Sequence, residues 1–110
     1  MRRKWYLSGS VTNDPDFRDK FEYAEYQLKS RGYKVLNPVK HEKDGKEWSY
    51  YLRKDLRKLT RCQGIILIDG WENSKGAKLE LQVAWGLGLE IMEFDCVTGY
   101  LCSVFEEINK

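Results

Sequence analysis

One short aliphatic run restricts the fold of this chain more than any other feature. Gly64-Ile65-Ile66-Leu67-Ile68 is apolar throughout and shows no alternation of polar and apolar side chains. A strand of this character is covered on both faces, as in a parallel sheet that has helices on either side. Residues 64–68 are therefore expected to form a buried strand of an α/β protein.

The segments around this run alternate between expected strands and expected helices. Further strands are predicted at Trp5–Leu7, Tyr33–Leu36 and Glu90–Phe94. Apolar residues at helical spacing predict helices from about 13–16 to 31–32, over 47–61 and 77–87, and a weaker helix at about 100–108. This order predicts one domain, 1–110, with a flavodoxin- or Rossmann-like three-layer α/β sandwich and a parallel sheet of four or five strands.

The composition excludes several classes of partner. Among 110 residues, 19 Lys and Arg face 17 Asp and Glu, so the net charge is 19 − 17 = +2. That balance predicts no nucleic-acid polymer as a partner but leaves a small anionic ligand open, because local fields matter more than totals. No apolar run approaches the ~18 residues of a membrane helix, so no membrane partner is expected.

Cysteine and histidine usage restricts the compartment and the cofactors. The three cysteines form no CxxC pair, which indicates reduced thiols and a cytoplasmic protein. The single histidine, His41, lies in a polar segment with no metal-ligand spacing around it. No metal site is therefore expected.

Two carboxylates fall on the apolar sides of predicted helices. Glu80 lies three residues after one apolar position of its helix and four before the next, and Asp55 has the same offsets in the preceding helix. A boundary position for Glu80 and a surface ion pair for Asp55 are the alternative interpretations. Two inward carboxylates suit glycosyl chemistry, in which retaining enzymes hold them about 5–5.5 Å apart.

Two loops rich in glycine and serine supply candidate binding residues. The first contains Ser8, Gly9 and Ser10, and Asp14 follows it as a helix cap or a ligand. The second contains Ser74 and Gly76, and Ser74 either caps the third helix or binds a phosphate or sugar hydroxyl. Both loops follow predicted strands, and ligands of such folds bind at the carboxyl ends of strands.

These motifs together resemble a known family. The order Tyr6-Leu7-Ser8-Gly9-Ser10, then Asp55-Leu56, then Ser74-Lys75-Gly76-Ala77-Lys78-Leu79-Glu80-Leu81 is similar to the nucleoside 2-deoxyribosyltransferase-like superfamily. That superfamily includes the deoxyribosyltransferases and the 2′-deoxynucleoside 5′-monophosphate N-glycosidases. The likeness is greatest to small, mostly uncharacterised phage and bacterial members, and its most specific part is Ser-x-Gly-x-x-x-Glu.

The resemblance implies a role for each candidate residue. Glu80 matches a nucleophile that attacks the anomeric carbon of a deoxyribose, and Asp55 matches a second carboxylate that positions or protonates the leaving base. Tyr6 matches an aromatic residue that orients the nucleophile or lines the pocket. The two loops match contacts to the sugar or phosphate. The resemblance implies no metal or organic cofactor, and it implies a homodimer or a higher homo-oligomer.

The sequence leaves three kinds of function open. The first is cleavage of an N-glycosidic bond or deoxyribosyl transfer on a nucleoside or its 5′-monophosphate. The second is a non-catalytic module that senses or sequesters a nucleotide, and the third is an interaction protein with an inactive site. The placement of Glu80 and Asp55 in the structure distinguishes the third from the other two.

Overall fold

The computed structural model describes residues 4–11, 14–41 and 47–104. One sheet has the strand order β2-β1-β3-β4-β5. Its strands are β1 (Lys4–Ser8), β2 (Lys34–Leu36), β3 (Gly64–Ile68), β4 (Glu90–Phe94) and β5 (Leu101–Ser103). The α-helices are α1 (Phe17–Ser30), α2 (Trp48–Leu59) and α3 (Lys75–Gly86), and two short 3₁₀ helices are η1 (Pro38–His41) and η2 (Trp71–Asn73).

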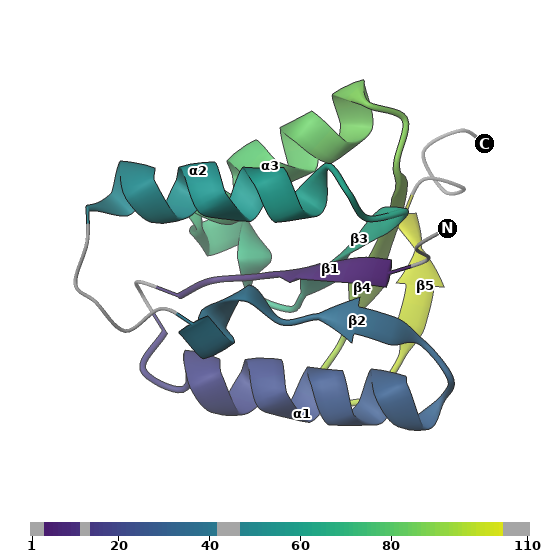
Figure 1. The fold of residues 1–110 in the computed structure, drawn as a ribbon. Coiled ribbons are helices and arrows are strands. Elements are labelled where there is room, and N and C mark those ends of the chain that lie inside the picture. Colours follow the sequence, from purple (N-terminus) through teal and green to yellow (C-terminus); the bar gives the residue numbers. More distant parts are fainter. Residues whose placement is uncertain (1–3, 12–13, 42–46, 105–110) are drawn as a thin grey trace.

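The elements form three layers. Helix α1 covers one face of the sheet, and α2 and α3 cover the other (Figure 1). Strand β1 contributes to the cores on both sides of the sheet, because its side chains alternate between the two faces. Trp5 and Leu7 join the core on the α1 side, whereas Tyr6 joins the core under α2 and α3. Strand β3 is buried at every position, and the predicted α/β sandwich is confirmed.

The strand order creates a crevice at one edge of the sheet. Strands β1 to β4 pair in parallel, and β5 pairs antiparallel to β4. The chain passes from β1 to β2 on one side and then returns past β1 to β3 on the other. The connections therefore diverge at the carboxyl ends of β1 and β3, which is where open α/β sheets bind ligands.

The chain after β4 differs from the sequence prediction. Leu101–Ser103 form a strand and not the start of a helix, and residues 105–108 of the predicted helix lie outside the described residues. A turn makes the hairpin, because Asp95 Oδ1 accepts the Val97 N–H at 2.8 Å and Gly99 has a φ of 74°. Pairing along the edge of β4 outweighs the local helical periodicity.

The first helix begins and ends close to the predicted positions. Gly32 follows its end with a φ of 94°, as expected for a glycine just past a helix. At its start the Asp16 side chain makes no capping bond, and Asp14 Oδ1 accepts the Asp16 N–H at 2.9 Å. Among the described helices, none is both long and apolar enough to cross a bilayer.

Candidate active site

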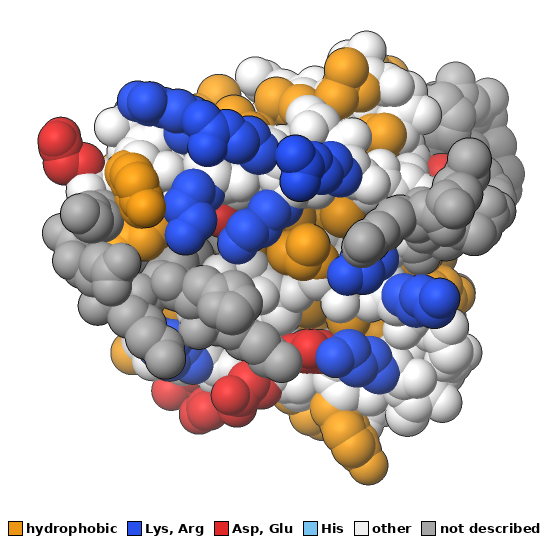
Figure 2. All heavy atoms as spheres, in the orientation of Figure 1, with side chains coloured by type: hydrophobic (Ala, Val, Ile, Leu, Met, Phe, Trp, Pro, Cys, Tyr) orange, Lys and Arg blue, Asp and Glu red, His pale blue; other side chains and the backbone are white. Residues whose placement is uncertain are grey.

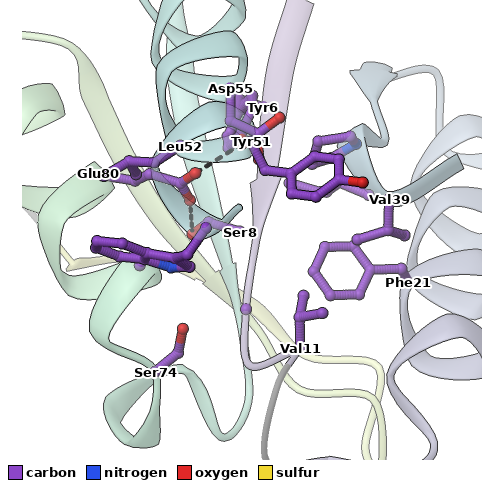
Figure 3. A pocket seen from close by; sticks show the side chains of 15 residues that line it. Tyr6, Ser8, Val11, Phe21, Val39, Tyr51, Leu52, Asp55, Ser74 and Glu80 are labelled. Carbon is purple, nitrogen blue, oxygen red and sulfur yellow. Dashed lines mark hydrogen bonds between the residues drawn. The ribbon is translucent and has the colours of Figure 1, made fainter. Parts of the chain in front are cut away.

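Glu80 lies on the side of α3 that faces the sheet, and only 7% of its surface is exposed. Both of its carboxylate oxygens accept hydrogen bonds from β1 (Figure 3). Tyr6 Oη donates to Oε2 at 2.8 Å, and Ser8 Oγ donates to Oε1 at 2.6 Å. Tyr6 and Ser8 are themselves buried. Two fixed hydroxyl groups therefore hold the carboxylate in one orientation.

The spacing of residues in β1 and α3 explains this contact. Residues two apart on a strand point to the same face, so Tyr6 and Ser8 both face α3. On α3, Ala77 and Ala84 are buried together with Glu80, and their small side chains let the helix approach the sheet closely. Glu80 is thus a buried residue and not a boundary one.

A cavity of about 270 Å³ opens beside this carboxylate at the carboxyl end of β1. Asp55 of α2 lines the same cavity and is half-buried. The side opposite Glu80 is apolar and contains Val11, Phe21 and Val39 (Figure 3). The cavity therefore joins an acidic, hydrogen-bonding side to an apolar side, which suits a ligand with one hydroxylated part and one flat part.

The first turn of α3 forms another part of the cavity wall. Ser74 is the helix cap, because its Oγ accepts the Ala77 N–H at 3.1 Å. Gly76 follows, and a Cβ at this position would meet Trp48 Nε1 at 3.7 Å and Ser74 Oγ at 3.9 Å, which are ordinary contacts. Its φ is not positive either. Neither backbone angle nor crowding requires a glycine at position 76.

The loop after β1 divides between this cavity and a neighbouring hollow. Gly9 lines the cavity, where a Cβ would lie 3.3 Å from both Ile68 Cβ and Phe21 Cζ, so packing favours glycine there. Ser10 and Asp14 line the neighbouring hollow instead. The sequence prediction placed both with the substrate-binding residues, and the structure does not bring them beside Glu80.

Lys20, which lines the neighbouring hollow, forms ion pairs with two carboxylates. Its Nζ lies 3.4 Å from Asp14 Oδ2 and 3.4 Å from Asp69 Oδ2. The same Nζ donates to the Asp69 carbonyl at 2.8 Å. Lys20 thus connects the turn before α1 to the end of β3.

The charges of this cluster reinforce one another. Burial opposes the charged form of Lys20, but Asp69 and Asp14 outweigh burial and raise the pKa of Lys20. Burial also opposes ionised Asp69, but hydrogen bonds from Cys96 and the charge of Lys20 lower the pKa of Asp69. Burial and the Asp69 charge raise the pKa of Cys96 to about 12, so this thiol stays protonated at neutral pH.

A family model described as "Domain of unknown function (DUF4406)" matches residues 3–93 of the sequence. The chain belongs to the DUF4406 family. The match includes both loops and both carboxylates of the candidate site. No curated protein gives a significant match.

Solved structures share the fold of this DUF4406 protein, with 15 matching chains. One is a 2-deoxyribosyltransferase from the psychrotolerant bacterium Bacillus psychrosaccharolyticus. It is 22% identical, with a TM-score of 0.65 over 84% of this chain and 72% of that chain. At this identity the likeness is one of fold, and it confirms the nucleoside 2-deoxyribosyltransferase-like fold that the motifs indicated.

Sequence patterns do not single out several residues that line the cavity of this DUF4406 protein. They are apolar or aromatic: Val11, Phe21, Val39, Tyr51 and Leu52. Helical periodicity assigns Phe21 and Leu52 to the core, but both lie early in helices that follow the carboxyl ends of strands. That position is a usable signal for pocket residues. Within the described ranges, no group of three or more His, Cys, Asp or Glu side chains has a metal-binding arrangement.

Proposed function

We propose that this protein breaks the N-glycosidic bond of a nucleoside or nucleoside 5′-monophosphate, by hydrolysis or deoxyribosyl transfer, with Glu80 as the nucleophile. The carboxylate of Glu80, held by Tyr6 and Ser8 beside a cavity, is the observation that carries the proposal. Burying a carboxylate opposes folding, and a catalytic role explains why one is kept there. The fold shared with a 2-deoxyribosyltransferase supports the same class of reaction.

The carboxylate retains the capacity to attack a sugar. Each carboxylate oxygen has about two lone-pair directions, and Tyr6 and Ser8 each donate one hydrogen bond to a different oxygen. In the proposed step a Glu80 oxygen bonds to C1′ while the C1′–N bond breaks, and its electron pair leaves with the base, which takes a proton. Water or the nitrogen of a second base then attacks C1′ and releases Glu80 as a carboxylate.

The remaining walls of the cavity fit the other parts of such a substrate. We assign the positioning or protonation of the leaving base to Asp55, which lines the cavity from α2. The apolar side at Phe21 and Val39 offers a surface to the base. Gly9, Ser74 and Gly76 are assigned to the sugar hydroxyls or the 5′-phosphate. Ser10 and Asp14 line the neighbouring hollow, where we assign them to a part of the substrate that extends beyond Gly9.

Release of free base tests this proposal. Purified protein is incubated with a panel of deoxynucleosides and their 5′-monophosphates, with and without a second base, and the products are separated by chromatography. Glu80→Gln should lower the rate about 10³-fold or more. Glu25→Gln is the matched control, because Glu25 is also 7% exposed but lies on α1, where it pairs with Lys29 and Asn37.

Other outcomes lead to different functions. Tight binding of a nucleotide that is recovered unchanged would make the chain a non-catalytic nucleotide-binding module. Base release by Glu80→Gln at the wild-type rate would exclude Glu80 as the nucleophile. If the protein neither binds a nucleotide nor releases base, the remaining interpretation is an interaction protein with an inactive site.

We further propose a homodimer that works in the cytoplasm. The resemblance implies a pocket completed by a second copy, and Trp48 lines the cavity while 46% exposed, as interface aromatics often are. Cys62, Cys96 and Cys102, all among the described residues, form no disulfide, which fits a reducing compartment. Light scattering should give twice the mass of one chain, and the mass of a single chain would contradict the dimer.

A further inference from the structure

The outer side of α2 carries a continuous series of cations. They are Arg53, Lys54, Arg57, Lys58 and, just past the helix, Arg61. These five residues are named the basic stripe, and Figure 2 shows Lys and Arg side chains gathered along this face. The carboxylate that α2 contains, Asp55, lines the active-site cavity. One carboxylate of α2 thus stands against the five cations of the stripe.

The structure does not neutralise these cations within its described part. The ion pairs there involve Lys20 and Lys29, and none involves the basic stripe. Lys54 Nζ lies over the Tyr50 ring, 5.6 Å from its centroid. Like charges one helical turn apart repel one another. A row of unpaired like charges, kept at a cost in stability, points to an anionic partner.

The basic stripe continues into a hollow beside the amino ends of β1 and β3. Lys4, Lys58 and Arg61 line a cavity of about 390 Å³ together with Leu36 and Cys62, and no carboxylate is among these described lining residues. Lys34 is the register partner of Lys4, so it adds a cation on the same face. This hollow lies at the opposite end of β1 from Ser8, and it is separate from the Glu80 cavity.

The length and chemistry of the basic stripe select one kind of anion. Arg53 to Arg61 spans about 12 Å at 1.5 Å per residue, which is longer than one phosphate group. A lipid surface fits poorly, because a membrane-bound helix inserts its apolar face, and Leu56 and Leu59 of α2 pack in the core. Protein interfaces have cores depleted in charge, whereas interfaces with nucleic acids are strongly positive.

We propose that the basic stripe and the adjoining hollow bind the sugar–phosphate backbone of a single-stranded nucleic acid. A single strand is favoured over a duplex because the Tyr50 ring, 41% exposed and with Lys54 Nζ over it, adds an aromatic and cationic surface for an unpaired base beside the stripe. The net charge of +2 predicts no such partner, but the cations are concentrated on one face. The binding does not depend on the chemistry of Glu80.

Fluorescence anisotropy with a fluorescein-labelled oligo(dT) of about 20 nucleotides tests the proposal. For about four phosphate contacts, the logarithm of Kd should rise with the logarithm of salt concentration with a slope of about 3. Arg53→Gln combined with Arg57→Gln should weaken binding about 25-fold at about 0.1 M salt and lower the slope by about 1.4. Arg53→Lys combined with Arg57→Lys should retain most of the affinity.

The matched control removes the same charge from another face. Lys29→Gln combined with Arg31→Gln, at the end of α1, should leave Kd unchanged within about twofold. Thermal unfolding verifies that each variant is folded. If the double variant of the stripe is not folded, Arg57→Gln alone replaces it, with an expected loss of affinity of about fivefold. Glu80→Gln should bind like the wild type, which keeps this test apart from that of the proposed reaction.

Four results would overturn the proposal. The first is no saturable binding at about 0.05 M salt, where such contacts are strongest. The second is an equal loss of affinity in the matched control. Tighter binding to a duplex of the same length would exclude the single strand as the preferred partner. Binding to phosphatidylserine vesicles without binding to the oligonucleotide would assign the stripe to a membrane surface.

Discussion

Ser8 Oγ lies 2.6 Å from Oε1 of Glu80, although 72 positions separate the two residues in the sequence. The contact joins β1 to α3, and the bond from Tyr6 fixes the other oxygen. Both donors come from one face of one strand. The orientation of the Glu80 carboxylate is therefore set by the sheet and not by a loop, which suits a group that must meet a substrate in one geometry.

Removing either hydroxyl should reduce turnover more than substrate affinity. Ser8→Ala and Tyr6→Phe each take away one bond that orients Glu80, so we expect kcat to fall about 10²-fold with KM changed only about threefold. Steady-state kinetics of base release measure both values. Ser8→Thr keeps a hydroxyl and should recover part of kcat. An unchanged kcat in both variants would show that these bonds do not position the nucleophile.

Glu80→Gln should be as stable as the wild type or more stable. The glutamine amide has nearly the same shape, and it removes a charged group whose desolvation opposes folding. We expect the free energy of unfolding to stay level or to rise by about 1 kcal/mol. Urea titration measures it. A loss of more than about 2 kcal/mol would indicate that Glu80 serves the fold instead of a reaction.

Gly76→Ala should stabilise the protein and impair its activity. Alanine is favoured over glycine within a helix by about 1 kcal/mol, and its Cβ would make only ordinary contacts with Trp48 and Ser74. The added methyl group would occupy space on the cavity wall that we assign to the substrate, so KM should rise about tenfold. Thermal unfolding and kinetics give the two effects. A more stable variant with unchanged KM would remove Gly76 from the binding site.

Asp69→Asn should destabilise the fold at neutral pH but not in acid. Burial alone would raise the pKa of Asp69, but Cys96 and Lys20 outweigh it and lower the pKa. The ionised carboxylate therefore stabilises the fold above its unfolded pKa of about 3.9, and this contribution is lost as pH falls through the lower, folded value. Since its side chain is 35% exposed, we expect about 1 kcal/mol.

Unfolding of the two proteins at pH 7 and near pH 2 measures this dependence. The free-energy difference between wild type and Asp69→Asn should be present at pH 7 and shrink in acid. A difference that does not change with pH would mean that the ionisation of Asp69 contributes nothing.

The sequence was informative wherever local spacing decides the outcome. The apolar run at 64–68 predicted a buried strand, and the helical offsets of Glu80 and Asp55 put both on or beside the apolar sides of their helices, with a boundary position and a surface ion pair as the alternatives. Ser74 was an expected helix cap, and its Oγ accepts the Ala77 N–H. In each case the neighbours that matter are at most four residues away, so periodicity contains the answer.

Long-range pairing decides the features that the sequence did not predict. That Ser8 meets Glu80 depends on how α3 packs against β1, and no local pattern encodes this rotation. Ser10 and Asp14 line the neighbouring hollow, and no local pattern tells which hollow a loop residue lines. The sequence around Leu101–Ser103 has helical periodicity, but pairing with the edge of β4 makes these three residues a strand.

The most direct test of the central claim is to look for the sugar on Glu80 itself. A reaction with the substrate that releases base is quenched in acid during turnover, digested and analysed by mass spectrometry. The peptide that contains Glu80 should carry the mass of the deoxyribosyl group, or of its phosphate, as an ester. Base release with no adduct on this peptide, together with wild-type release by Glu80→Gln, would contradict the role of Glu80 as nucleophile.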